Sequence, residues 1–442
     1  MLAKITASGI PPGFHTLQTH IGSKSRYVTP VADPRLNLTR RFTLARPIDA
    51  AGQPTEIEVL ENPVDATMHA QTRVLKFGGE LFWYEAYTTV PPYRFTGVRR
   101  GYWDTAPASH PRGEIGGILD VSEFCAISCY LDQNTDLQDE VAAKLARAYN
   151  CGFDYVYLDG SEGVNRPFNF HVANAQLRYW KMLRPEPLFG EAAAKTHFGW
   201  HMLAGANAFD CFPPEVFKKN LRAYPFMQAP ITQQDMTRVD FGWWYFALPK
   251  KNEDGHGWKS LGTQADLWEY GVSVATAWNC AASISMQLDS LKAHPRTDDI
   301  FTTMRRWADV RRRGLFREEW RDELKDHLRE HHLLVDADGK YDLVRYEEIL
   351  AGDSYRPVRA FFFEKDGSSW VVYWHCVGEG RLWLPIAAGD VAVYDEFAGR
   401  PVKVEASNGG VVIPAGNRLY LKSRLGRSAL ATAFSSSRLA RQ

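Results

Sequence analysis

Between residues 114 and 313 the sequence alternates between short apolar runs and longer amphipathic stretches, and this alternation restricts the fold more than any other feature. The apolar run 126–131, for example, is followed by the amphipathic stretch 136–149. Strands that alternate with helices over a long span are typical of a parallel α/β sheet. Because the sequence has no Gly-x-Gly-x-x-Gly or Walker motif, a nucleotide-binding doubly wound sheet is disfavoured. We therefore expect a (β/α)8-type barrel over residues 10–330.

The same alternation predicts the strands and helices on either side of the next segments, after the helix expected at 136–149. The helices expected from apolar spacing cover 171–184, 187–195, 263–279 and 298–313. The strands expected from short apolar runs cover 153–158, 198–203, 238–244 and 283–287.

Two β-rich segments accompany this pattern. Residues 32–112 combine alternating apolar positions with many turn residues, so we expect a β-rich module inserted into the barrel. Toward the C-terminus the runs 359–364 and 369–375 flank a hairpin turn, which predicts an antiparallel β-sandwich over 335–425. The segment 426–442 is rich in Ser, Arg and Ala, and we expect a flexible tail there.

Composition narrows the class of partner. With 52 basic and 52 acidic residues the formal net charge is zero, which excludes a broad electrostatic grip on nucleic acid or on an anionic membrane. The chain is rich in aromatic residues, with 14 Trp, 19 Tyr and 24 Phe. Such side chains suit the stacking of sugar rings, although they fill protein cores equally well. A saccharide partner is therefore expected, and the oligomeric state stays open.

Cysteine spacing and the N-terminus add little. The six cysteines include no Cys-x-x-Cys pair and no histidines at zinc-site spacing, so neither a metal nor another cofactor is expected. No signal peptide and no run of 18 apolar residues is visible. A cytoplasmic location and a periplasmic or secreted location after removal of a leader both fit this pattern.

The segment 157–163 is the clearest candidate for chemistry. It reads Tyr-Leu-Asp-Gly-Ser-Glu-Gly and ends the apolar strand 153–158 with two acids, Asp159 and Glu162. An acid that follows a buried parallel strand lies at the carboxyl edge of the sheet, where barrel enzymes carry their active sites. The alternative is an Asp that only caps the next helix.

Two carboxyl groups in different environments are what glycosidic bond cleavage requires. One group must donate a proton and so needs a raised pKa, whereas the other must be ionised as nucleophile or base. Asp159 and Glu162 are three residues apart and fall within one turn, so we expect a further partner from another strand, Asp240. The predicted catalytic residues are Asp159, Glu162 and Asp240.

Other polar or aromatic residues near the expected strand ends are candidates for substrate binding. They are His15, Asp132, His201, Trp243, Trp244 and Gln287. Each has a structural alternative: Asp132 as a residue that orients a loop, and His201 as a core histidine bonded to backbone. By strand alternation only one of the two tryptophans can face a site, while the other packs on helices.

Several of these segments resemble TIM-barrel glycoside hydrolases. Residues 153–163 are similar to the mid-barrel motif in which Tyr-x-Asp-Gly carries a catalytic acid, and 241–244 and 283–287 resemble the later part of that barrel. The stretches 382–385 and 414–418 are similar to the β-sandwich that follows the barrel in a bacterial, largely uncharacterised branch. The resemblance covers most of the chain through short motifs.

The resemblance also implies roles. In α-galactosidase-like barrels an Asp after the fourth strand is the nucleophile and an Asp after the sixth is the acid/base. By the expected strand order these places match Asp159 and Asp240, while Glu162 is not part of the pattern. The expected function is a glycoside hydrolase acting on a poly- or oligosaccharide.

Two other functions fit the same residues. The first is a polysaccharide lyase on a uronic-acid-containing glycan, with His15, His201 and Arg238 as base and carboxylate partner. The second is a non-catalytic carbohydrate-binding protein whose stacking tryptophans matter more than its carboxylates.

Overall fold

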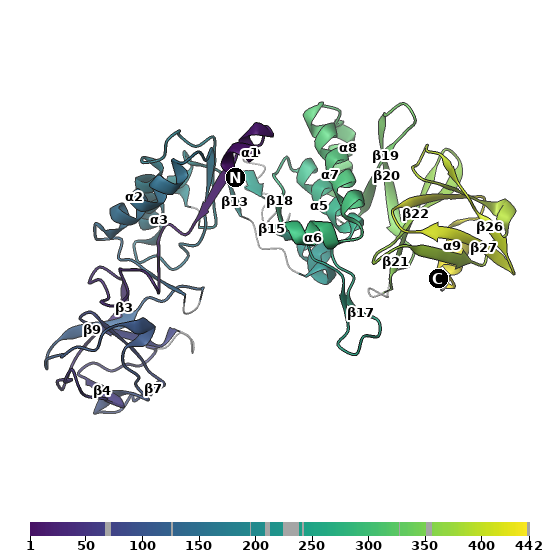
Figure 1. The fold of residues 1–442 in the computed structure, drawn as a ribbon. Helices are drawn as coiled ribbons and strands as arrows, with labels where there is room; N and C mark the ends of the chain where they lie inside the picture. The colour runs from purple at the N-terminus through teal and green to yellow at the C-terminus, as the bar shows by residue number, and fades with distance from the viewer. Residues whose placement is uncertain are drawn as a thin grey trace. The chain divides into compact units, whose positions relative to one another are not determined.

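The computed structural model describes the chain except for residues 67–71, 125–126, 195, 208–212, 224–237, 241–242, 327, 351–355 and 440–442. For 204–207, 238–240 and 243 it describes the backbone alone. The chain divides into two compact units, Met1–Ala206 and Asn207–Gln442 (Figure 1). Among the described helices, none is both long and apolar enough to cross a lipid bilayer.

A parallel sheet forms the centre of the first unit. Its strands, in the order in which they pair, are β1 Gly13–Thr16, β11 Tyr155–Leu158, β12 Gly190–Ala192 and β13 Leu203–Asn207. The helices packed beside it are α2 Leu137–Tyr149 and α3 Phe168–Trp180, while α1 Leu2–Ala7 opens the chain. Val156 and Leu158 of the sheet share one buried cluster with Ala146 of α2 and Tyr179 of α3. The expected combination of parallel strands and flanking helices is present in this unit.

Three expected elements in this unit differ from the prediction. The run 126–131 contains β10 Ser128–Tyr130, which pairs antiparallel with β2 His20–Gly22 and leaves β1 to pair directly with β11. The stretch 187–195 was expected to be helical, but it contains β12, because both edges of that strand pair with neighbours. The strand expected at 198–203 starts only at Leu203, after the short 3-10 helix η3 His197–Gly199.

Segment 32–112 contains six short antiparallel strands in its described part, as its turn-rich sequence predicts. They are β3 Leu38–Thr43, β4 Glu56–Val59, β5 Val74–Phe77, β6 Glu80–Trp83, β7 Ala86–Tyr87 and β8 Tyr93–Thr96, with η2 Tyr102–Asp104 and β9 Ile115–Leu119 after them. They form a sheet of order β3-β9-β5-β6 and a second sheet of order β4-β8-β7. Phe42, Phe77 and Phe95 belong to the buried cluster of these strands.

A buried charge cluster ties the strands to their loops. The Glu80 carboxylate, which is fully buried, accepts hydrogen bonds from Arg100 Nη2 (2.6 Å) and the Ala108 N–H (2.9 Å) and lies 3.0 Å from His110 Nε2. Burial alone would raise the pKa of Glu80, but these partners outweigh it and lower the pKa to about 2. For His110, burial would lower the pKa, but the bonds to Glu80 and Glu114 raise it.

This cluster predicts a bounded pH range of local stability. The contribution of Glu80 is complete above its ordinary pKa of 4.5 and is lost as the pH falls toward 2, whereas that of His110 is complete below 6.5 and is lost as the pH rises through its folded value. Hydrogen exchange of β5 and β6, corrected for its intrinsic pH dependence, should therefore be slowest between these two limits. Glu80→Gln should flatten the acid side of the profile, and an unchanged profile would contradict the assignment.

In the second unit a layer of helices precedes a β domain. Its first elements are η4 Pro214–Val216, β14 Arg238–Asp240, β15 Trp243–Tyr245, β16 Lys250–Lys251, β17 Trp258–Ser260, α5 Ala265–Ala277, β18 Ser283–Ser285, α6 Leu288–Ala293, α7 Thr297–Arg312 and α8 Glu318–Lys325. Every residue of α5 is buried, because α7, α8 and the strand that follows α8 pack around it. β15 and β18 pair in parallel.

The remainder of the unit is antiparallel, in agreement with the period of two in its sequence. Its strands are β19 Glu330–Val335, β20 Tyr341–Glu348, β21 Val358–Lys365, β22 Ser368–His375, β23 Gly380–Leu384, β24 Val391–Tyr394, β25 Pro401–Val402, β26 Glu405–Ser407, β27 Gly410–Ala415, β28 Leu419–Ser423 and β29 Arg438–Leu439, with η5 Ala388–Asp390 between β23 and β24. They form one sheet of order β19-β20-β21-β22-β28-β24-β25 and another of order β26-β27-β23-β29.

The expectation of a flexible tail over 426–442 is wrong for its described part. Residues Arg427–Ser435 form α9, and Leu430, Ala433 and Phe434 are buried in the core of the β domain. Their spacing of three and four residues places them on one helix face. The strand β29 then pairs with β23.

A buried acid joins α5 to the β domain. Glu269 Oε2 lies 2.8 Å from His332 Nδ1, and Glu269 Oε1 accepts the Leu333 N–H at 3.0 Å. Arg418, also buried, lies 3.6 Å from the same carboxylate. Burial would raise the pKa of Glu269, but His332 and Arg418 lower it, so the group is held as an anion.

Removing this anion should strongly destabilise the second unit. Glu269→Ala leaves the Leu333 N–H without its acceptor and removes the buried charge that faces His332 and Arg418, and loss of one partner of a buried ion pair costs about 3–5 kcal/mol. Urea denaturation followed by tryptophan fluorescence would measure the change. The exposed Glu319→Ala on α8 is the matched control, for which about 0.5 kcal/mol or less is expected. Equal effects of the two substitutions would contradict this role of Glu269.

Candidate active site at the carboxyl end of β11

The loop that follows β11 has an unusual and well-held backbone. Gly160 and Ser161 both have positive φ, 71° and 81°. Gly160 is required, because a Cβ there would lie 2.5 Å from His20 Cε1. Ser161 is fully buried, and its hydroxyl is bonded by Gln18 Nε2 (3.0 Å) and Thr19 Oγ1 (2.9 Å). A non-glycine residue keeps such a conformation only where its surroundings hold it, so the two acids that flank this turn are presented in a fixed place.

The first acid, Asp159, is held as a carboxylate. Its Oδ2 lies 3.0 Å from His15 Nε2, while Oδ1 accepts the Gly160 N–H at 2.9 Å and the Tyr157 hydroxyl at 3.3 Å. Burial would raise the pKa of Asp159, but these hydrogen bonds and the charge of His15 outweigh it, and the pKa is lowered. His15 belongs to β1, so the direct β1–β11 pairing creates this contact, with His15 opposite Tyr157.

The second acid, Glu162, has the opposite shift. Glu162 is exposed as a residue, yet partial burial of its carboxyl group and a hydrogen bond with Glu123 raise its pKa to about 7. The negative charges of Glu123 and Asp159 act in the same direction. Like charges placed close together cannot all ionise at their ordinary pKa, so Glu162 retains its proton up to near-neutral pH.

Glu123 is itself anchored by a tyrosine of β10. The Tyr130 hydroxyl donates to the Glu123 carboxylate, with 2.6 Å and 2.9 Å to its two oxygens. The Gly163 N–H donates in turn to the Tyr130 hydroxyl oxygen at 3.0 Å. Thus the loop that carries Asp159 and Glu162 is fastened to β10 at its far end.

A buried histidine completes the surroundings of the acids. The ring of His20 lies edge-on to Tyr130, with 4.5 Å between centroids, and its Nε2 is 3.8 Å from Glu123 Oε2. Burial lowers the pKa of His20, and this outweighs the opposite effects of Glu123 and Asp159. His20 is therefore held neutral, and it adds no positive charge beside the carboxyl groups. The ring of Phe124, which is partly exposed, also lies edge-on to His20, with 5.6 Å between centroids.

Asp132, predicted to bind substrate, instead organises its own loop. Its Oδ1 accepts the Asn134 N–H (2.9 Å), the Asn134 side-chain amide (3.0 Å) and the Asn165 side-chain amide (2.9 Å). The structural alternative for this residue is the one observed. The reason is that β10 pairs with β2 and does not join the parallel edge.

His201 lies at the wrong end of the sheet for a site beside Asp159. It precedes β13, whose first residue, Leu203, pairs with Gly190 at the amino end of β12. Asp159 follows β11 at the carboxyl end, where Leu158 pairs with Ala192. His201 is exposed and packs edge-on against Trp200 at 5.6 Å. The prediction that it binds substrate with Asp159 is therefore corrected.

The remaining candidates belong to the second unit. Trp244 is fully buried against Trp268 and Phe217, so it is a core residue and the prediction that it binds substrate is wrong. Gln287 is exposed just beyond the carboxyl end of β18. Asp240 is the last residue of β14 and Trp243 the first of β15, and the described part of each is its backbone.

Sequence reasoning did not find Glu123 and Tyr130. The antiparallel bridge between Val121 and Cys129 folds the chain back on itself, and the pairing of Tyr130 with His20 brings this hairpin to β2. The available signal was the apolar run 126–131 directly after the acid-containing segment 120–123, which is compatible with a hairpin as well as with a barrel strand.

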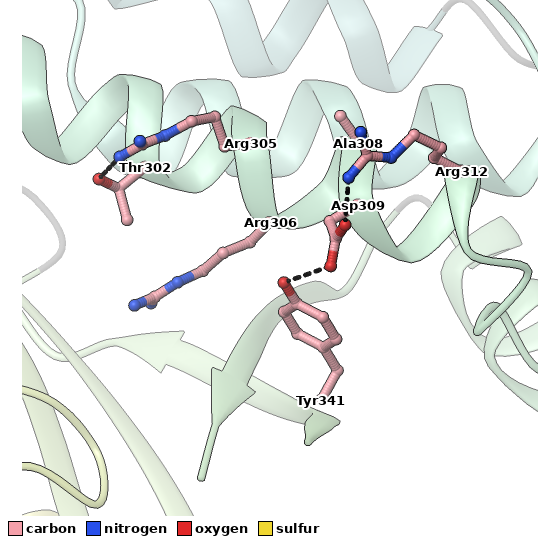
Figure 2. Close-up of a pocket in the computed structure, with 7 residues that line it drawn as sticks. All are labelled: Thr302, Arg305, Arg306, Ala308, Asp309, Arg312 and Tyr341. Carbon is pink, nitrogen blue, oxygen red and sulfur yellow. Dashed lines mark hydrogen bonds and ion pairs between the residues drawn. The ribbon is translucent and has the colours of Figure 1, made fainter. Parts of the chain in front are cut away.

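A separate pocket in the second unit has no comparable pair of carboxyl groups in its lining. It has a volume of about 560 Å³ and lies beside α7 and β20 (Figure 2). Its acid, Asp309, is held by Arg312 (2.9 Å) and by the Tyr341 hydroxyl (3.1 Å). Arg306 points toward β-domain residue Glu396 and pairs with it at 2.9 Å. Its charges are largely matched within the protein.

In the described chain no group of three or more His, Cys, Asp or Glu is arranged to hold a metal ion.

Comparison with known proteins gives no family and no curated relative. No known protein family and no curated protein matches the sequence. Solved structures do match. The family 27 glycoside hydrolase β-L-arabinopyranosidase from Geobacillus stearothermophilus is 10% identical and covers 70% of this chain and 67% of its own, with a TM-score of 0.31.

Two further matches cover more of the chain. The cyclic α-maltosyl-(1→6)-maltose hydrolase from Arthrobacter globiformis is 10% identical over 96% of this chain and 77% of its own, with a TM-score of 0.35. An α-amylase from Lactobacillus plantarum is 10% identical over 95% of this chain and 80% of its own, with a TM-score of 0.33.

Proposed function

We propose that this protein is a glycoside hydrolase that cleaves a poly- or oligosaccharide with Asp159 and Glu162. The observation that carries the proposal is the pair itself. One loop at the carboxyl end of a parallel strand holds an acid kept ionised by His15 and another kept protonated beside Glu123. Two carboxyl groups whose environments move their pKa values apart are typical of a general acid and a general base in one active site.

The reaction follows from these protonation states. Glu162 donates its proton to the glycosidic oxygen as the bond to the anomeric carbon breaks. The Asp159 carboxylate either attacks that carbon or takes a proton from the attacking water, according to the separation of the two groups across the bound sugar. His15 keeps Asp159 anionic and fixes its orientation through the 3.0 Å contact.

The fold proposed for these strands is the (β/α)8 barrel that the sequence alternation predicts, over residues 10–330 with the module 32–112 inserted and the β-sandwich 335–425 after it. Asp240, Trp243 and Gln287 remain proposed contributors to catalysis and binding. Position supports Asp240 and Gln287, which lie at or just beyond the carboxyl ends of β14 and β18, whereas Trp243 begins β15 at the opposite end of the β15–β18 pair. No cofactor is needed for the chemistry proposed.

The test is an incubation of the purified protein with a panel of neutral and uronic-acid glycans, with reducing ends and ultraviolet absorbance read together. New reducing ends without new absorbance are expected. Absorbance that rises with the reducing ends would mean an unsaturated product, and hence a lyase. Binding without either product would mean a carbohydrate-binding protein. Each of the latter outcomes would overturn the proposal.

A further inference from the structure

The proton donor of the proposed reaction hydrogen-bonds to another carboxyl group. Glu162 and Glu123 come from different parts of the chain, the loop after β11 and the hairpin before β10. A hydrogen bond between two carboxyl groups requires one proton between them. The question is which of the two holds it.

The direction of the neighbouring hydrogen bonds answers this. The Gly163 N–H donates to the Tyr130 oxygen, which leaves the Tyr130 proton to be donated to Glu123 over 2.6 Å. Glu123 is therefore the acceptor in its bond with the tyrosine. The proton in the bond between the two acids then belongs to Glu162, which donates toward Glu123.

The other charged or titratable groups around the pair do not reverse this assignment. His20 from β2 is held neutral by burial, because its pKa is lowered. Asp159 is anionic and its charge favours a protonated Glu162. His15 is engaged with Asp159 at 3.0 Å. The Tyr130 hydroxyl keeps its proton, since burial and Glu123 raise its pKa.

We propose that Glu123 is a positioning residue for this reaction, which together with Tyr130 keeps the transferable proton on Glu162 and holds the donor in place. The inference rests on the proposed function. When Glu162 gives its proton to the glycosidic oxygen, it becomes an anion next to the Glu123 anion. That repulsion favours return of a proton from the incoming water to Glu162, which restores the starting state without any other reactant.

The test compares Glu123→Gln with wild type. The substitution keeps the size of the side chain but removes its charge, so Glu162 should ionise about one to two pH units lower. Nuclear magnetic resonance of carboxyl-labelled glutamate would follow this titration without a substrate. On a glycan of the panel that the wild type cleaves, kcat at pH 7 should fall about 5- to 50-fold, while kcat at pH 5 should stay within about twofold of wild type.

Two control variants distinguish a failure of the role proposed for Glu123 from a failure of the proposed function. Exposed Glu186→Gln, on the loop before β12, should leave the pH profile unchanged. Glu162→Gln identifies the donor. The alkaline limb of the pH profile is the loss of kcat as the pH rises. If Glu162→Gln abolishes this limb while Glu123→Gln leaves it in place, the role of Glu123 is overturned and the proposed function stands. If Glu162→Gln keeps full activity, the proposed function fails at the donor.

A second variant tests the same proposal in case Glu123→Gln does not fold. Tyr130→Phe keeps the ring that packs on His20 but removes the proton donated to Glu123. The alkaline limb should move to lower pH, by less than in Glu123→Gln, because the Glu123 carboxyl group is retained and only its bond from Tyr130 is lost. An unmoved limb in a folded Tyr130→Phe protein would count against the proposal.

Discussion

Asp159→Asn is expected to lower kcat by about 100- to 10,000-fold while leaving the protein folded, because it removes the ionised carboxylate of the proposed reaction. The amide preserves the shape of the side chain, so the hydrogen bonds from the Gly160 N–H and Tyr157 can persist on Oδ1. Release of reducing ends and far-ultraviolet circular dichroism would be measured on the same samples.

The matched control for this substitution is the acid at the other end of the same strand. Asp154 immediately precedes β11 at its amino end, whereas Asp159 follows the strand at its carboxyl end. Asp154→Asn should therefore leave kcat near the wild-type value. A folded Asp159→Asn protein with wild-type turnover would remove this residue from the mechanism, and equal losses in both variants would indicate a general effect on the sheet.

Glu162→Gln should have an effect that depends on the leaving group. Loss of a general acid costs about 100- to 10,000-fold for natural sugar leaving groups, which need protonation. An aryl leaving group that departs without a proton should be released at a rate much closer to wild type. Comparison of a natural glycan with a nitrophenyl glycoside of the same sugar measures this difference directly.

The pH profile gives a second measure of the same residue. Because the pKa of Glu162 is raised to about 7, its protonated and active form is present below that pH and is lost as the pH rises through it. The wild-type alkaline limb should therefore have its midpoint near pH 7, and Glu162→Gln should remove it. A limb that persists in the variant would assign the proton to another group, with Asp240 the next candidate.

The secondary structure was predictable where local periodicity and burial agree. α2 and α5 fall within the expected helical stretches, α7 starts one residue before its expected stretch, and the antiparallel strands from residue 330 onward follow the expected period of two. The segment around β12 was not predictable, because its alanines favour a helix and only the pairing with β11 and β13 makes it a strand. β13 has small residues, Leu-Ala-Gly-Ala-Asn, with little strand preference of their own.

The candidate site was predictable in the part that lies on one strand and its loop. Asp159 and Glu162 follow β11 directly, and His15 sits on a strand whose alternation is visible in the sequence. The contribution of Glu123 and Tyr130 depends on a hairpin and on the β2–β10 pairing, and this pairing joins residues more than 100 positions apart. No local pattern encodes such a contact. Trp244 shows the converse, since a Gly-Trp-Trp sequence does not reveal which ring turns into the core.

The bond from the Gly163 N–H to Tyr130 has a consequence for how the chain matures. β1, β2 and β10 are synthesised before β11, so the segments that hold the acids are ready before the acids themselves appear. Until residue 163 has left the ribosome, Glu123 cannot bond to Glu162, and the Tyr130 hydroxyl cannot accept a hydrogen bond from the Gly163 N–H. A nascent chain that stops short of this residue is therefore expected to be catalytically silent, however well its earlier strands have folded.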